Sequence, residues 1–130
     1  MSDTLQELIT VALLLLGGLL MLIAAIGVVR LPDLLTRMHA TTKAGTLGAA
    51  LTIAAVAVHF AEASVTARAV AIILFIVLTA PVAAHVIGRA GYFVCVPLWR
   101  GTVKDDLREN YDPQSHVLHS GLPGDKPEKK

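Results

Sequence analysis

Long apolar stretches alternate with short polar ones along most of this chain. Three intervals contain no Asp, Glu, Lys or Arg, and they lie between Glu7 and Arg30, Lys43 and Glu62, and Arg68 and Arg89. About 20 predominantly apolar residues form a helix long enough to cross the hydrocarbon core of a bilayer. The pattern therefore predicts three transmembrane helices, at about residues 8–29, 44–60 and 69–88.

The first apolar stretch predicts a retained helix rather than a signal peptide. Residues 8–29 would form about 33 Å of helix at 1.5 Å per residue. A signal peptide has a basic start and a shorter apolar run, whereas the residues here, MSDTLQELIT, are acidic. We therefore expect an all-α membrane protein with three spans.

The overall composition supports a membrane protein. Hydrophobic residues make up 55% of the 130 residues and charged residues 16%, against about a quarter in soluble domains. The net charge of +1 gives no electrostatic reason to expect a nucleic-acid partner. The single cysteine, Cys95, excludes an internal disulfide and a cysteine metal cluster.

The basic residues predict the orientation of the chain, because loops rich in Lys and Arg stay in the cytoplasm. The first loop carries Arg30, Arg37 and Lys43, and the second carries only Arg68. After the third span come Arg89, Arg100, Lys104 and Arg108. We expect a multi-pass protein with its N-terminus outside and its first loop and C-terminus inside.

Residues 101–130 are polar and predict a cytoplasmic tail that follows a membrane domain at residues 1–100. The stretch KDDLREN favours a weak helical turn. The last stretch, SGLPGDKPEKK, offers little apolar surface to bury, so we expect it to be disordered. Tyr92, Phe93 and Trp99 suit the headgroup region, where aromatic side chains anchor a helix end.

Small residues recur at every fourth position in the second and third spans. The rows are Ala40, Ala44, Gly48 and Thr52, then Thr41, Gly45 and Ala49, then Ala80, Ala84 and Gly88. Such rows let helices approach closely in lipid. They suit packing among the three helices or docking onto partner subunits, and their number favours partners.

The polar stretch between the first two spans, RLPDLLTRMHATTKAGTLG, predicts an amphipathic cytoplasmic helix over residues 31–44. Pro32 suits its first turn, and Asp33 suits the positive end of the helix dipole. One side would carry Leu31, Leu34, Leu35 and Met38, and the other Asp33, Thr36, Arg37, His39 and Lys43. The four-residue spacing of Asp33 and Arg37 favours an ion pair.

Two interpretations fit this segment. A helix lying along the headgroups explains the leucines and arginines, but gives less reason for Thr36, His39, Thr41 and Thr42. A polar face that docks a partner or borders a cation route would use them, because carboxylate and hydroxyl oxygens bind hard cations and histidine exchanges protons near neutral pH. The residues alone leave both open.

Pro81 and His85 mark the third span. Pro81 cannot donate to the Val77 carbonyl, so the helix bends or opens there unless a group such as Thr79 satisfies that carbonyl. His85 lies one turn further on the same face. A simple kink with a histidine near the interface is favoured over a polar point facing a water-filled pathway.

No pattern for catalysis accompanies these spans. The sequence contains no Gly-rich phosphate loop, no Ser-His-Asp pattern and no paired carboxylates within a span. His116 and His119 stand three residues apart in the tail, which is a poor metal site. We therefore expect no enzyme, no metal site and no cofactor.

The stretch RLPDLLTRMHATTKAGTLG resembles the signature of the G-type subunit of Mrp-type (Mnh or Pha) multisubunit cation/proton antiporters. LTAPVAAHVIGRAGY, at residues 78–92, is similar to the third-helix segment of that family. The resemblance covers about residues 8–92 and implies a small three-span subunit, required for assembly, near the proposed cation route. By position, it assigns family residues to Arg30, Pro32, Asp33, His39, Lys43, Pro81 and His85.

We therefore expect a non-catalytic subunit of a Na⁺ or K⁺/H⁺ antiporter in a bacterial cytoplasmic membrane. Its partners would be lipid and the other antiporter subunits, including large antiporter-like ones. No span contains an acid, the usual mark of an ion relay. A small self-assembling transporter and a purely structural or regulatory membrane protein are the alternatives.

Overall fold

The computed structural model describes residues 2–94, 96–102, 105, 107, 110–112, 115 and 117–119. Its elements, in chain order, are α1 (Ser2–Arg30), α2 (Leu34–Ala40), the π-helix η1 (Thr41–Gly45), α3 (Thr46–Phe60), α4 (Ala63–Phe93), β1 (Tyr111–Asp112) and β2 (Val117–Leu118). The architecture of the described residues is mostly helical, as the sequence predicted.

Among the described residues, three helices are long and apolar enough to cross a membrane. They run over Asp3–Arg30, Leu34–Phe60 and Ala63–Phe93, which confirms the prediction of three spans. Each is longer than the apolar stretch that predicted it. A helix extends past its apolar residues because each added residue still gains a backbone hydrogen bond, whatever its side chain.

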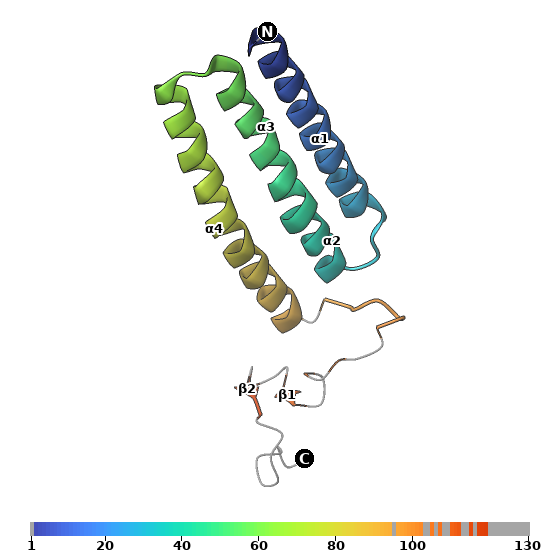
Figure 1. Cartoon of the computed structure of the whole chain (residues 1–130). Coiled ribbons are helices and arrows are strands. Elements are labelled where there is room, and N and C mark those ends of the chain that lie inside the picture. Colours follow the sequence, from blue (N-terminus) through green and yellow to red (C-terminus); the bar gives the residue numbers. More distant parts are fainter. Residues whose placement is uncertain are drawn as a thin grey trace, which may run out of the picture.

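The amphipathic segment belongs to the second span and is not a separate helix. The backbone stays helical from α2 through η1 into α3, and the three form one rod (Figure 1). The expected break near residue 44 is absent, and the helix begins at Leu34 rather than at residue 31. A single π-helical turn carries the chain from the amphipathic part to the apolar part.

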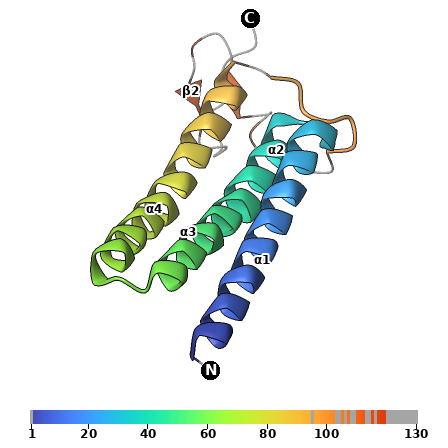
Figure 2. The ribbon, with the colours of Figure 1, turned by 90° about the horizontal axis from the view of Figure 1, so that it is seen from above.

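The three long helices form a single layer with α3 in the middle. In both views α3 lies between α1 and α4 (Figures 1 and 2), and no contact joins α1 to α4 among the described residues. The layer encloses little, because its buried side chains are small ones, namely Thr10, Ala24, Ala55 and Ala69. Both broad faces are therefore left for lipid or other proteins.

Small residues make the contacts inside this layer. A Cβ added at Gly17 of α1 would lie 2.7 Å from Thr52 Oγ1, and one at Gly48 of α3 would lie 2.7 Å from the Gly17 carbonyl oxygen. On α4, a Cβ at Gly88 would lie 3.2 Å from Met38 Cε. Residues from two of the predicted rows are therefore used within the chain, which removes much of their support for partner docking.

A polar clamp joins α1 to α3 at the end of the layer where the N-terminus lies. Gln6 Nε2 donates to the Val58 carbonyl at 2.7 Å and to the His59 carbonyl at 2.9 Å. These carbonyls lie in the last turn of α3, where no further helical N–H follows. Ala61 then takes a left-handed conformation (φ 49°, ψ 26°) and ends the helix.

The tail forms a short hairpin that the sequence pattern did not predict. β1 and β2 are antiparallel, with Tyr111 opposite Leu118 and Asp112 opposite Val117. Residues 120–130, and with them the predicted disorder of SGLPGDKPEKK, lie outside the described residues, as does most of KDDLREN. The division into residues 1–100 and 101–130 stays a prediction.

Candidate functional site

Asp33 caps the helix that carries the candidate residues. Its backbone is extended (φ −127°, ψ 164°), and its carboxylate accepts the Thr36 backbone N–H at 2.8 Å. An acidic N-cap satisfies one of the free amides at a helix start. Pro32 therefore lies before the cap, and not in the first turn as predicted.

The Asp33 carboxylate is held ionised by the groups around it. Hydrogen bonds from the Thr36 hydroxyl and then the Thr36 backbone N–H lower the pKa of Asp33 below its usual value, and partial burial opposes them. The Trp99 backbone N–H and the Arg37 charge lower it by smaller amounts. The cap, and not an ion pair, is therefore the main interaction of this carboxylate.

Arg37 contributes mainly to the loop before the helix. Its Nε donates to the Leu31 carbonyl at 2.8 Å, and its charge is the smallest of the influences on Asp33. The spacing of Asp33 and Arg37 predicted a direct ion pair. The structure instead places the guanidinium against the backbone of the loop, where a carbonyl needs a donor.

The hydroxyls of Thr41 and Thr42 both serve the backbone of the π-helix. Thr41 Oγ1 donates to the Met38 carbonyl at 2.9 Å, and Thr42 Oγ1 donates to the same oxygen at 2.8 Å. A π-turn disturbs the regular backbone ladder, and threonine hydroxyls compensate carbonyls at such places. Together with Thr36 at the cap, the threonines therefore have a structural explanation that the sequence did not reveal.

His39 and Lys43 are the two candidate residues left without such a role. Both are exposed, and no hydrogen bond or ion pair joins either of them to another described residue. Their four-residue spacing puts them on nearly the same face of the α2–η1 rod. Lys43 lies about 13 Å along the rod from Leu34, at 1.5 Å per residue, and so within the span.

Pro81 and His85 are exposed on α4, which stays helical from Ala63 to Phe93. The Thr79 hydroxyl donates to the Phe75 carbonyl at 2.7 Å. It therefore does not bond the Val77 carbonyl, to which Pro81 cannot donate. His85 lines an open groove beside Leu35 and Met38 of α2. The structure therefore brings His85 beside α2, which carries other candidate residues, whereas Pro81 is exposed on α4.

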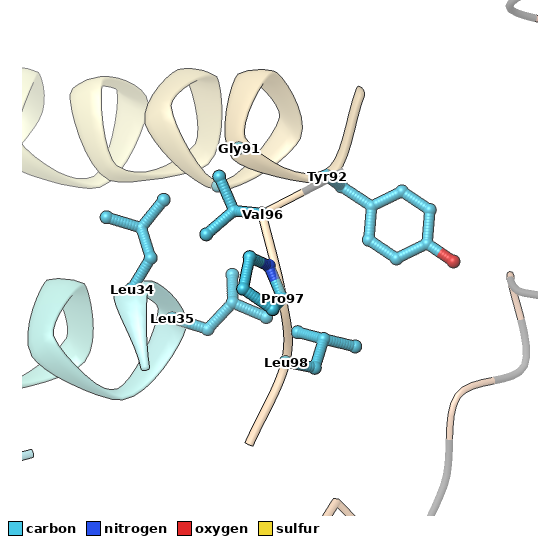
Figure 3. A pocket seen from close by; sticks show the side chains of 8 residues that line it. Leu34, Leu35, Gly91, Tyr92, Val96, Pro97 and Leu98 are labelled. Atoms are coloured by element: carbon cyan, nitrogen blue, oxygen red, sulfur yellow. The ribbon is translucent and has the colours of Figure 1, made fainter. Parts of the chain in front are cut away.

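Residues after α4 fold back onto the start of α2. Val96, Pro97 and Leu98 lie against Leu34 and Leu35 (Figure 3), and leave a cavity of only about 10 Å³. Gly91 permits the close approach of α4 to α2, because a Cβ there would collide with Leu34 Cδ2. The backbone of Trp99, just beyond, contributes to the lowered pKa of the Asp33 carboxylate.

Contacts between residues that are far apart in the sequence were not predicted. They include the Gln6 clamp on α3, the Trp99 interaction with Asp33, and the Tyr92 hydroxyl that donates to Asp105 at 3.1 Å. The placement of Trp99 beside basic residues indicated an anchor, but not its partner. Within the described residues, no cluster of three His, Cys, Asp or Glu side chains is arranged to hold a metal ion.

These features define a small three-span membrane protein with an open helical layer and a polar, capped start to its second span. The family described as "Na+/H+ antiporter subunit" (PhaG/MnhG/YufB) matches residues 13–92, and the chain belongs to this family. The resemblance drawn from the polar stretch and the third span is thereby confirmed.

Two relatives match over nearly their full length. The chain is 40% identical over 111 residues to the G-type Na⁺/H⁺ antiporter subunit of Alkalihalophilus pseudofirmus, covering 84% of this chain and 93% of that one. It is 37% identical over 112 residues to the G1-type Na⁺/H⁺ antiporter subunit of Staphylococcus saprophyticus, covering 85% and 95%.

Two solved membrane complexes contain chains of the same fold. A chain of the Mrp complex from Dietzia sp. DQ12-45-1b superposes with a TM-score of 0.76 at 22% identity, covering 80% of this chain and 94% of that one. A chain of an archaeal membrane-bound sulfane sulfur reductase, a respiratory membrane complex, gives 0.70 at 34% identity, covering 78% and 95%. The three-helix layer thus occurs in chains that belong to larger assemblies.

Proposed function

We propose that this chain is the G-type subunit of a multisubunit antiporter that exchanges Na⁺ or K⁺ for H⁺ across a bacterial cytoplasmic membrane. The observation that carries the proposal is the family match over residues 13–92. The open layer agrees with it, because a chain whose broad faces are uncovered suits assembly with other subunits.

The proposed role is accessory and not catalytic. Between Glu7 and Glu62 the only acid is Asp33, which caps α2, and the next acid after Glu62 is Asp105. Intramembrane acids are the usual members of cation and proton relays. The chain would therefore support assembly and border the cation route, while larger subunits carry the relay.

His39 and Lys43 form the proposed docking face. A lysine within a span is costly in hydrocarbon unless its side chain reaches the interface or meets protein or water. Because the threonines nearby already serve the backbone, this exposed pair is the part of the candidate segment best placed to meet a partner subunit or the cation entrance.

The proposed orientation places the N-terminus outside and the first loop and tail in the cytoplasm. Arg30, Arg37 and Arg89 lie near the end of the layer where α1 ends and α2 begins, while Arg68 lies near the other end of α4. Basic residues favour the cytoplasmic side. Cysteine accessibility at residues 4 and 102 from outside intact cells would test this arrangement.

The experiment replaces the chromosomal copy with a tagged chain and measures two properties separately. Co-purification in mild detergent reports assembly, and Na⁺-dependent proton movement in inverted vesicles reports antiport. We expect the tagged chain to carry other membrane subunits with it. Antiport by the purified chain alone would instead establish a self-assembling transporter, and a chain without partners would contradict the subunit role.

Single variants then distinguish the docking and route roles. His39→Ala and Lys43→Gln are compared with His59→Ala, an exposed histidine near the opposite end of the same span. Loss of co-purification with the first two variants alone indicates docking, and loss of antiport with assembly intact indicates the route. Unchanged assembly and antiport in both variants would refute the proposed face.

A further inference from the structure

An open groove lies between α2 and α4 near the end of the layer where the tail begins. Its volume is about 650 Å³, and its walls are largely apolar, with Leu35 and Met38 from α2, Ala84 and Gly88 from α4, and Leu107 and Tyr111 from the tail. At Gly88, α4 comes close to α2, because a Cβ there would lie 3.2 Å from Met38 Cε. An elongated apolar ligand could therefore lie along α4.

Arg89 supplies a cation to this groove. Its guanidinium carbon lies 5.1 Å from the centroid of the Phe93 ring, which holds the side chain at the end of α4. No ion pair joins Arg89 to a carboxylate among the described residues. Asp105, on the tail nearby, instead accepts a hydrogen bond from the Tyr92 hydroxyl. The charge of Arg89 is thus free to meet a ligand.

The charged and apolar parts of the groove lie at different depths. Arg89 lies one helical turn before Phe93, where α4 ends. A span that ends at Phe93 places Arg89 at the level of the lipid headgroups. Ala84 lies about 7 Å deeper along the same helix, at 1.5 Å per residue. A ligand that matches this groove has a charged end at the membrane surface and an apolar end in the hydrocarbon.

The charge at this end of the layer selects an anion. Arg30, Arg37 and Arg89 all lie here. The described acids nearby already accept hydrogen bonds: Asp33 from Thr36, Asp105 from Tyr92 and Asp112 from Ser115. Basic pockets between transmembrane helices bind anionic headgroups. A partner helix would have to bring an acid to the headgroup level as well as an apolar face, whereas a phospholipid carries both parts in one molecule.

We propose that this groove binds an anionic phospholipid, with the phosphate beside Arg89 and one acyl chain along Leu35, Met38 and Ala84. The lipid would fill the gap between α2 and α4 on one broad face of the layer. It would also cover the side of α4 that carries His85. This site is separate from the exposed pair His39 and Lys43.

The test measures lipid binding to the full-length chain by native mass spectrometry in detergent, with phosphatidylglycerol and phosphatidylcholine titrated separately. We expect tighter binding of phosphatidylglycerol. Arg89→Gln should weaken that binding about fivefold, because a basic residue near the surface contributes about 1 kcal/mol. Binding of phosphatidylcholine should weaken less, because its choline cation offsets the charge of its phosphate, and Arg89→Lys should retain most of the preference.

Matched variants keep the proposal falsifiable. Arg68→Gln removes the same charge from the first two turns of α4, outside the groove, and should leave binding unchanged. Ala84→Leu narrows the groove without altering charge and should weaken binding of both lipids. Helical content measured by circular dichroism controls for misfolding.

Three results would overturn the proposal. One is equal affinity of the wild-type chain for both lipids. Another is an equal loss of phosphatidylglycerol binding in Arg68→Gln and Arg89→Gln. The third is a cross-link from Ala84→Cys to a neighbouring subunit in the intact complex, which would show that a protein helix fills the groove.

Discussion

The backbone of Gly48 in α3 packs directly against the backbone of Gly17 in α1. A Cβ at residue 48 would lie 2.7 Å from the Gly17 carbonyl oxygen and 3.0 Å from the Met21 backbone nitrogen. Backbone atoms cannot move aside as a flexible side chain can, so this contact fixes the distance between the two helices. This close contact helps to hold α1 and α3 together in lipid, where the burial of apolar surface does not drive helices to associate.

Gly48→Ala should therefore separate α1 from α3 and lower the free energy of unfolding by about 1–3 kcal/mol, as overpacking does. Thermal or denaturant unfolding of the detergent-solubilised chain measures this. Gly18→Ala is the matched control, since nothing lies within 4 Å of a Cβ there, and it should be neutral or gain up to about 1 kcal/mol from helix propensity. Equal effects of the two variants would contradict the close contact.

Replacing Asp33 separates its capping role from its charge. Asp33→Ala removes the acceptor for the Thr36 N–H and should cost about 1 kcal/mol of stability. Asp33→Asn keeps a good cap without a charge, so its stability should stay within a few tenths of a kcal/mol of the wild type. Unfolding and antiport are measured on both. A stable Asp33→Asn variant that assembles but does not transport would assign a function to the charge itself.

Asp33 should contribute to the pH dependence of stability only at acidic pH. Its folded pKa is lowered, chiefly by the Thr36 hydroxyl, so its contribution is complete above the unfolded pKa of about 3.9. That contribution is lost as the pH falls through the lower folded pKa. The stability difference between wild type and Asp33→Asn should be constant from about pH 5 to 8 and should change below about pH 4. A change between pH 6 and 8 would show that another group is linked to Asp33.

The π-helix offers a test of whether its threonines are structural. Thr42→Val keeps the shape but removes the hydroxyl that donates to the Met38 carbonyl, and should cost about 0.5–1.5 kcal/mol. Thr42→Ser keeps the donor and should recover most of this loss. Melting temperatures of the two variants measure the effect. Normal stability but defective antiport in Thr42→Val would instead favour a direct role in the cation route.

Some features of the candidate site could be predicted because they are local. The start of a helix near Asp33 and the likeness of the polar stretch to a subunit family both come from residues close together in the sequence. The ion pair of Asp33 and Arg37 was also a local prediction, but the Leu31 carbonyl competes for Arg37. Spacing alone does not reveal which acceptor lies closer.

The sequence by itself determined the three spans, since about 20 apolar residues in lipid have almost no alternative to a helix. It also determined the family, through the polar stretch and the third-span segment. Only the tertiary structure decided that the amphipathic segment continues into α3, that rows of small residues pack within the chain, and that the segment after α4 packs against the start of α2. These outcomes depend on which helix faces meet, and helical periodicity gives the faces but not their partners.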